Sequence, residues 1–159
     1  MNAELEYRSA NLGDCDDILR LRNQKDSLKF QLFAEPIAPD THKSWFSDRL
    51  VRLPREPFLV FLSDNTIIGY CRADREDNLN YKVSISLDSL HQGHGIGTRM
   101  LNIMVREASL VGATLVAYVH KENVASGRIF KKCGFQIDHT ITDKCFDTYK
   151  RNLINNPGN

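Results

Sequence analysis

The segment from Gln92 to Thr98 combines three glycines with a position directly in front of an amphipathic helix. Glycine permits a positive φ and a close approach of the backbone, so several N–H groups can converge on one anion at the positive end of a helix dipole. The segment therefore predicts a cradle for pyrophosphate. A tight turn between a strand and a helix is the alternative interpretation. The candidate anion-binding residues are Gln92, Gly93, His94, Gly95, Ile96, Gly97 and Thr98.

The elements on either side must hold this segment in place. Apolar and polar residues alternate from Tyr81 to Leu87, which is typical of a strand with one buried face. Apolar residues then recur every three or four positions from Gly97, which predicts a helix that ends around Val111-Gly112. Residues 114–119 predict the next strand. Because a helix connects the two strands, we expect them to be parallel.

The rest of the chain predicts further strands and helices of a mixed α/β domain. Residues 5–9 predict a strand, and Asp14 can cap a helix that ends near Arg22-Asn23. The prolines within residues 24–40 predict an irregular loop, and Asp40 or Thr41 can cap a second helix that continues to Leu53. The other expected elements are hairpin strands at 58–62 and 66–70, a helix at 124–133, and closing strands at 135–141 and 145–151.

Composition narrows the function classes. The length of 159 residues fits one domain, and a net charge of +1 gives no indication of a nucleic-acid partner. The N-terminus lacks the pattern of a secretory leader, and no apolar run reaches the roughly 20 residues that span a bilayer, so we expect a cytoplasmic protein without a membrane partner. The cysteines are scattered and the histidines are not clustered, which predicts reduced thiols and no metal site. These cysteines are Cys15, Cys71, Cys133 and Cys145.

A second motif follows the glycine segment at a distance of some thirty residues. It reads Asn-x-x-Ser-x-x-x-Phe-x-x-x-Gly-Phe over residues 123–135. Together with Gln-x-x-Gly-x-Gly at 92–97, it resembles the GCN5-related N-acetyltransferases (GNAT), and the order of elements agrees over nearly the whole chain. The resemblance implies a single GNAT-like domain over residues 1–159. Its fold is an α/β (α+β) mixed sheet, largely antiparallel, with one splayed parallel strand pair and about four helices.

The resemblance also implies that acetyl-CoA is the co-substrate. In this family the cofactor lies between two parallel strands that splay apart at its pantetheine arm. Here that assigns backbone pairing to Ile85 and Leu87, and pyrophosphate binding to the N–H groups from Gln92 to Thr98. Asn123 is assigned a supporting role, with a helix N-cap as the alternative. The oligomeric state stays open, a homodimer included.

The reaction joins an amine to a thioester carbonyl and releases a thiolate. The resemblance assigns the N–H near Leu87 to polarise that carbonyl. The family often has a tyrosine acid in the cofactor site where this chain has Phe130, but a thiol with a pKa near ~8.5 can leave with little help, and Phe130 then serves packing. Glu122 is the first candidate for the general base, with an exposed glutamate at a helix start as the alternative. The weaker base candidates are His120, Ser86 and Asp74.

The N-terminal half indicates the acceptor. Arg22-Asn23, the His42-x-x-Trp45 element and the glycine-bearing strand at 67–70 resemble acetyltransferases of nucleotide-linked deoxyamino sugars in bacterial surface-glycan pathways, including the pseudaminic acid route. Leu21 stands where that branch frequently has tryptophan. Arg22 and His42 could contact the sugar nucleotide's diphosphate. The alternatives are a helix C-terminus for Arg22, the surface for His42 and the core for Trp45. The expected apolar surface for a deoxysugar or base consists of Phe30, Phe33 and Trp45.

Two other classes stay open. An acidic cleft would suit acetylation of a protein N-terminus, a polyamine or an aminoglycoside. A non-catalytic acyl-CoA sensor would keep the cofactor motifs and lack the usual acid, as Phe130 indicates. The residues that could form the acidic cleft are Glu35, Asp74, Glu76 and Asp77.

Overall fold

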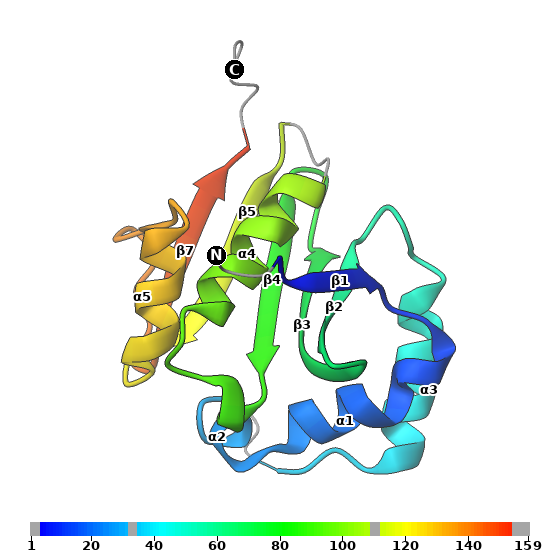
Figure 1. Ribbon diagram of the computed structural model, residues 1–159. Coiled ribbons are helices and arrows are strands. Elements are labelled where there is room, and N and C mark those ends of the chain that lie inside the picture. Colours follow the sequence, from blue (N-terminus) through cyan, green and yellow to red (C-terminus); the bar gives the residue numbers. More distant parts are fainter. Residues whose placement is uncertain (1–3, 32–34, 109–111, 154–159) are drawn as a thin grey trace.

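Seven strands form one mixed sheet in the order β1-β2-β3-β4-β5-β7-β6 (Figure 1). The computed structural model describes residues 4–31, 35–108 and 112–153. Within these ranges the β4–β5 pair is parallel and every other pair of neighbouring strands is antiparallel. The strands are β1 (Glu6–Ser9), β2 (Phe58–Ser63), β3 (Thr66–Arg75), β4 (Asn80–Leu87), β5 (Thr114–His120), β6 (Gln136–Ile137) and β7 (Phe146–Asn152).

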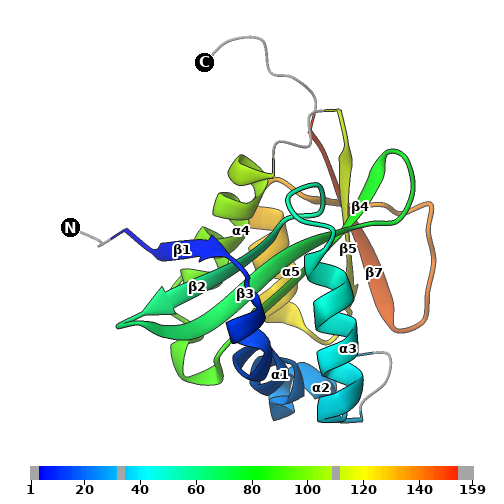
Figure 2. The same ribbon diagram turned by 90° about the vertical axis from the view of Figure 1, so that its right-hand side faces the viewer.

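Helices cover both faces of the sheet (Figure 2). The helices α4 and α5 pack on one face through a core that includes Met100 and Phe130, and α1 and α3 pack on the other through a core that includes Leu21 and Phe46. Because β3 is covered on both sides, it contains consecutive apolar residues instead of a strict alternation. The helices are α1 (Cys15–Asn23), α2 (Lys25–Lys29), α3 (Pro39–Leu50), α4 (Ile96–Glu107) and α5 (Val124–Lys132).

The structure confirms the predicted mixed sheet and its parallel pair, and it corrects the segment 24–40. This segment is not wholly irregular, since α2 occupies residues 25–29. The extended backbone of Gln24, with ψ of 145°, ends α1 and starts α2. Neither Asp40 nor Thr41 caps α3, because Ala38 is the N-cap and proline occupies the first turn. Proline suits that place, where its missing N–H would have no helical partner.

Several predicted boundaries also change, and β3 continues to Arg75 instead of ending at residue 70. Helix α3 ends at Leu50 instead of Leu53. Helix α4 ends at Glu107, and residues 109–111 of its predicted end lie outside the described residues. Strand β6 covers two residues instead of 135–141, because the carboxylate of Asp138 accepts hydrogen bonds from Thr140 and turns the chain.

Candidate functional site

The parallel strands β4 and β5 pair over only part of their length. Residues 80–82 pair with residues 114–116, although β4 continues to Leu87 and β5 to His120. Beyond the three pairs the strands run toward their carboxyl ends without pairing to each other (Figure 1). A gap in the pairing of these two strands is therefore left at this end of the sheet.

The backbone of Ile85 and Leu87 faces this gap. Gly69 of β3 lies opposite Leu87. The N–H of Asp88 donates to the carbonyl of Ile68 at 2.7 Å. Asp88 and Ile68, the next pair along the ladder, are therefore a hydrogen-bonded pair. Hydrogen-bonded and non-hydrogen-bonded pairs alternate in an antiparallel ladder. The N–H and C=O groups of Ile85 and Leu87 therefore point away from β3, toward β5.

The carbonyl of Leu87 is held by two glutamines. It accepts from Gln24 Nε2 at 2.9 Å and from Gln92 Nε2 at 3.1 Å. Gln24 also accepts a hydrogen bond from the N–H of Ser89 at 3.2 Å through its own side-chain oxygen. Gln24, at the junction of α1 and α2, thus holds the end of β4 in place. Because the carbonyl of Leu87 is already bonded, its backbone N–H is the group that can donate to a ligand.

The glycine segment has the backbone that an anion cradle requires. Gly93 and Gly95 have φ of 82° and 76°, and a side chain at either would meet nothing within 4 Å. Gly95 is the N-cap of α4 and supplies no side-chain hydrogen bond, so the first N–H groups of the helix are open to a ligand. The N–H of Gln92 already donates to Ser89 at 3.4 Å, so we assign Gln92 to holding the loop. His94 is exposed.

Helix α5 packs closely against α4 and the sheet. A Cβ on Gly97 would lie 2.8 Å from Ile129, and a Cβ on Gly127 would lie 2.8 Å from the hydroxyl oxygen of Tyr149. Asn123 caps α5 by accepting from the N–H of Ser126 at 3.2 Å. Two residues of the second motif therefore have structural roles: Gly127 allows α5 to pack closely, and Asn123 caps this helix.

Phe130 is a core residue. Its side chain is 2% exposed, and its ring lies 5.0 Å from that of Phe135 and 5.9 Å from that of Tyr149 between centroids. This geometry supports the packing interpretation. The phenylalanine ring has no hydroxyl that could act as the acid that a tyrosine often supplies at this position in the family.

The base candidates differ in their surroundings. Glu122 is exposed at the β5–α5 junction, and its N–H donates to His120 Nδ1 at 3.2 Å. His120 therefore accepts through Nδ1, and its ring centroid lies 5.6 Å from that of Phe30 and 5.2 Å from that of Phe146. Ser86 is held among Gln24, Ser27 and the carbonyl of Leu21. The carboxylate of Glu122 is the candidate that is open to water.

The predicted acceptor residues Arg22, His42 and Trp45 lie together. Arg22 Cζ is 4.2 Å from the centroid of the Trp45 ring. The Nη1 atom of Arg22 lies 3.2 Å from Nδ1 of His42. His42 is completely buried instead of exposed, so we expect it to act on a ligand only through Arg22. Trp45 is half-buried beside the α1/α3 core. Phe33 lies outside the described residues.

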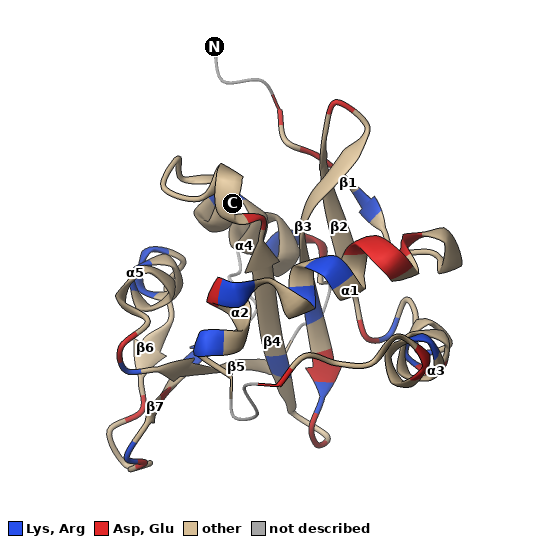
Figure 3. Cartoon of the chain, turned by 90° about the horizontal axis from the view of Figure 1, so that it is seen from below, with Lys and Arg blue, Asp and Glu red and all other residues tan. Residues whose placement is uncertain are grey.

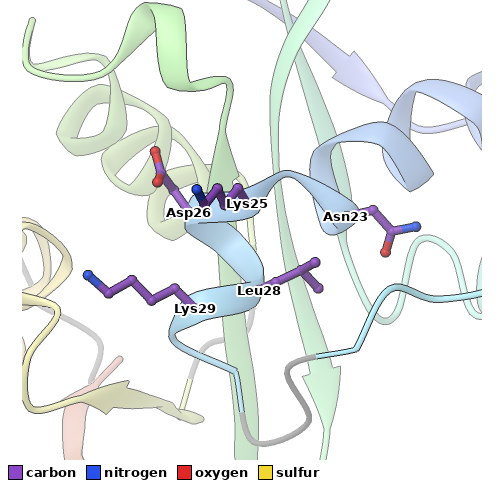
Figure 4. Close-up of a pocket in the computed structure, with 5 residues that line it drawn as sticks. All are labelled: Asn23, Lys25, Asp26, Leu28 and Lys29. Atoms are coloured by element: carbon purple, nitrogen blue, oxygen red, sulfur yellow. The ribbon is translucent and has the colours of Figure 1, made fainter.

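An open pocket of about 510 Å³ lies along α2 at the same end of the sheet. Lys29 and Leu28 point to opposite sides of this helix, which crosses in front of β4 (Figure 4). Asn23 belongs to the pocket lining and also anchors the chain before α3, because its amide group bonds both the N–H and the carbonyl of Ile37. Basic and acidic residues both lie on α1 and α2 at this end of the molecule (Figure 3).

The acidic cleft of the alternative interpretation is not present as an open negative surface at Asp74. Its carboxylate accepts from Arg49 Nε at 2.6 Å and also from Arg72 Nη1. Burial alone would raise the pKa of Asp74, but the charges and hydrogen bonds of the two arginines outweigh it and lower the pKa. Glu76 accepts from the Tyr118 hydroxyl at 2.9 Å. Asp74 is therefore neither a free base nor an unpaired anion.

Sequence reasoning missed Gln24, Arg49 and Arg72. Arg72 alternates with buried residues along β3, so its pattern reads as the polar face of a strand. The partners of Gln24 on β4 lie more than sixty residues away along the chain. No local pattern in the sequence signals either contact.

The described residues contain no group of three or more His, Cys, Asp and Glu side chains that could hold a metal ion. Across these same parts of the chain, no helix is both long enough and apolar enough to cross a membrane.

Comparison with known proteins then gives the family. The profile of the family described as "Acetyltransferase (GNAT) domain" matches residues 4–136. The chain belongs to the GNAT acetyltransferase family. It is a GNAT-type N-acetyltransferase, and the predicted family is confirmed.

Relatives of this GNAT chain have different names and acceptors. It is 26% identical over 140 residues to the L-methionine sulfoximine/L-methionine sulfone acetyltransferase of Salmonella typhimurium, covering 84% of this chain and 81% of that protein. The structure resembles a phosphinothricin acetyltransferase from Sinorhizobium meliloti in complex with acetyl-CoA (TM-score 0.80, 20% identity, 95% and 89% of the two chains). It also resembles spermidine N-acetyltransferase from Vibrio cholerae in complex with CoA and spermine (TM-score 0.76, 18% identity, 94% of each chain).

Proposed function

We propose that this N-acetyltransferase moves the acetyl group of acetyl-CoA to the amino group of a nucleotide-linked deoxyamino sugar. The assignment of this acceptor rests on the placement of Arg22, whose guanidinium lies over the ring of Trp45 and is held by buried His42. A fixed cation beside an aromatic surface suits a diphosphate joined to a sugar or base. The resemblance of this segment to sugar-nucleotide acetyltransferases supports the same acceptor.

The donor site fits acetyl-CoA in two places. The glycine segment presents open N–H groups and room for phosphate oxygens at the start of α4. The outward-facing backbone of Ile85 and Leu87 suits the amides of a pantetheine arm in the gap between β4 and β5. Acetyl-CoA or CoA is named in both structural relatives described above, which supports this assignment.

In the reaction, the chain positions an amine against a polarised carbonyl. The N–H of Leu87 donates to the thioester oxygen and stabilises the charge that develops there. The attacking amine forms the new C–N bond while the C–S bond breaks, and the electron pair leaves with the sulfur as a thiolate. Glu122 accepts the proton of the amine directly or through water. No acid from position 130 is required.

An amine with a carboxylate is the second candidate acceptor. The relative at 26% identity is named for methionine sulfoximine and methionine sulfone, which are amino-acid derivatives. The guanidinium of Arg22 would also suit their carboxylate. A polyamine is less favoured, because Asp74 is already paired with Arg49 and Arg72.

The cysteines support a cytoplasmic location within this proposal. Cys15, Cys71, Cys133 and Cys145 are all free thiols. Free thiols are typical of a reducing compartment. We further propose that residues 1–159 act as one domain, and light scattering in solution tests the homodimer that the resemblance leaves open.

Thiol release from acetyl-CoA tests the proposed function. The acceptors are a UDP-linked 4-amino-4,6-dideoxy sugar, its 4-hydroxy counterpart, methionine sulfone, spermidine and a peptide. We expect the amino sugar nucleotide to give the highest kcat/KM and the 4-hydroxy counterpart to give none. If methionine sulfone is acetylated faster than the amino sugar nucleotide, the acceptor is instead the second candidate, an amine with a carboxylate. No thiol release above the rate without amine, for any acceptor, would favour the acyl-CoA sensor.

A further inference from the structure

Two guanidinium groups from different elements meet at one tryptophan ring. Arg22 of α1 and Arg72 of β3 place their Cζ atoms 4.2 Å and 5.0 Å from the centroid of the Trp45 ring on α3. Both distances lie in the range of cation–π contacts. Because three elements that are distant in sequence supply these groups, their meeting is a property of the folded chain.

This cluster holds more positive than negative charge. Arg49 and Arg72 share the carboxylate of Asp74. In the described parts of the chain, Arg22 forms no ion pair. Arginine stays protonated in proteins, so three guanidinium groups face one carboxylate and two positive charges remain. This excess of positive charge, on side chains that are buried or partly buried, is costly unless a ligand with negative charge compensates it.

Arg72 also has an unused donor. Its side chain is 13% exposed. Its Nη1 atom donates to Asp74, while its Nε–H is buried and has no partner among the described residues. A buried donor without a partner loses the hydrogen bond that water would have given it. Arg72 thus has a hydrogen-bond donor at this cluster that no described residue uses.

His42 fixes the orientation of Arg22. Its Nε2 atom lies 2.9 Å from the carbonyl of Cys15, and a carbonyl can only accept, so Nε2 carries the proton. The other ring nitrogen, Nδ1, then accepts from Arg22 Nη1. Burial lowers the pKa of His42, which favours this neutral form. One nitrogen of Arg22 is thus tied to the protein, and the remaining donors of its planar fork stay available.

The spacing along β3 and β4 favours one type of anion. Arg72 pairs with Ser84, three residues before Leu87 on β4. At about 3.3 Å per residue, the backbone of Arg72 and the amide of Leu87 are ~10 Å apart along the strand. A sugar ring with its glycosyl phosphate can bridge such a separation. The amine and carboxylate of an α-amino acid cannot, because both are attached to the same carbon.

We propose that Arg22, Arg72 and the ring of Trp45 form the subsite for the diphosphate of the acceptor, with His42 as a positioning residue. This inference rests on the proposed function, which places the thioester beside Leu87. It adds Arg72 as a specificity-determining residue. Two guanidinium forks match the two phosphates in charge and in hydrogen-bonding geometry.

Fluorescence of Trp45 tests this subsite without any catalytic readout, since it is the only tryptophan of the chain. The protein is saturated with CoA to occupy the glycine segment and is then titrated with UDP. We expect saturable quenching in the wild type and at least tenfold weaker UDP binding in Arg72→Gln and in Arg22→Gln. The matched control is Arg75→Gln, an exposed arginine of the same strand, which should bind UDP like the wild type.

The outcomes separate this inference from the proposed function. Wild-type affinity for UDP in Arg72→Gln, or no response of Trp45 to UDP, overturns the subsite. Methionine sulfone that quenches Trp45 where UDP does not also overturns it. If Arg72→Gln does not fold, as shown by its circular dichroism, the test passes to Arg72→Lys, which keeps the charge and loses the fork; unchanged UDP affinity in that variant contradicts bidentate binding. If the enzyme binds UDP at Trp45 but acetylates no sugar nucleotide, the proposed acceptor is wrong and the diphosphate subsite is supported.

Discussion

The ring of Phe130 lies beside that of Tyr149, with 5.9 Å between their centroids, at the contact of α5 with β7. Phe130 is therefore built into the core at the place where the family often carries an acid. Gly127, one turn earlier, lets α5 approach the hydroxyl of Tyr149 closely. The phenylalanine supports the contact between helix and sheet, and the leaving thiolate has to depart without a donor at this position.

We expect Phe130→Tyr to raise kcat by less than tenfold. A CoA thiolate is a good leaving group near neutral pH, so an added acid has little to contribute. Steady-state acetylation measures the effect. Phe135→Tyr is the matched control, since it adds the same hydroxyl to the adjacent buried ring. A gain well above tenfold in Phe130→Tyr alone would show that the missing acid limits turnover.

Glu122→Gln should lower kcat by roughly tenfold or more and remove the acidic limb of the pH–rate profile. The exposed carboxylate is proposed to take the amine proton, and general-base catalysis contributes about 10²–10⁴-fold. Glu76→Gln is a control, because that carboxylate already accepts from Tyr118. A Glu122→Gln enzyme with the wild-type rate and the wild-type acidic limb would exclude Glu122 as the base.

Stability should fall on acidification because of His42. Burial lowers its pKa below the usual 6.5, so the folded state prefers the neutral ring. The stabilisation is complete above the unfolded pKa and is lost as the pH falls through the lower pKa of the folded state. Urea unfolding between about pH 8 and pH 5 measures this slope. His42→Gln should flatten the slope, and substitution of exposed His139 should not. Equal slopes in the wild type and His42→Gln would contradict a buried neutral His42.

Arg49→Met should destabilise the fold by about 3–5 kcal/mol. The buried guanidinium donates to Asp74 and to the carbonyls of Glu56, Pro57 and Ala73. Its loss leaves three carbonyls without this donor and removes one of the two cations that hold Asp74. Exposed Arg52→Met should change stability by less than about 0.5 kcal/mol. A similar free energy of unfolding for both variants would mean that the buried network contributes no net stability.

Local patterns predicted the fold well where each pattern had one structural solution. Alternation over residues 81–87, the helical period after Gly97 and the short connection between them required a parallel crossover, which the structure contains. The segment 24–40 was harder. The single helical turn of α2 is shorter than any period can reveal, and its position depends on Gln24 bonding a distant strand.

The candidate site was predictable where the backbone forms it. Gly93 and Gly95 have the positive φ that their residue type indicated. The side-chain cluster was only half predicted, because Arg22, His42 and Trp45 carry a recognisable spacing while Arg72 joins them through the register of the sheet. His42 was expected at the surface or against a ligand, and its burial follows from the packing of α3 on α1.

The measurement that most directly tests the central claim is calorimetric titration of acetyl-CoA into Gly95→Glu and Gly112→Glu. Both glycines have a positive φ, 76° and 81°, and open space where a Cβ would lie, so both variants carry the same type of backbone strain. Only Gly95 precedes α4, where a carboxylate would repel the pyrophosphate. We predict loss of acetyl-CoA binding in Gly95→Glu with an unchanged circular dichroism spectrum, and wild-type affinity in Gly112→Glu. Undiminished affinity for acetyl-CoA in Gly95→Glu would contradict the account and show that the glycine segment is only a turn between strand and helix.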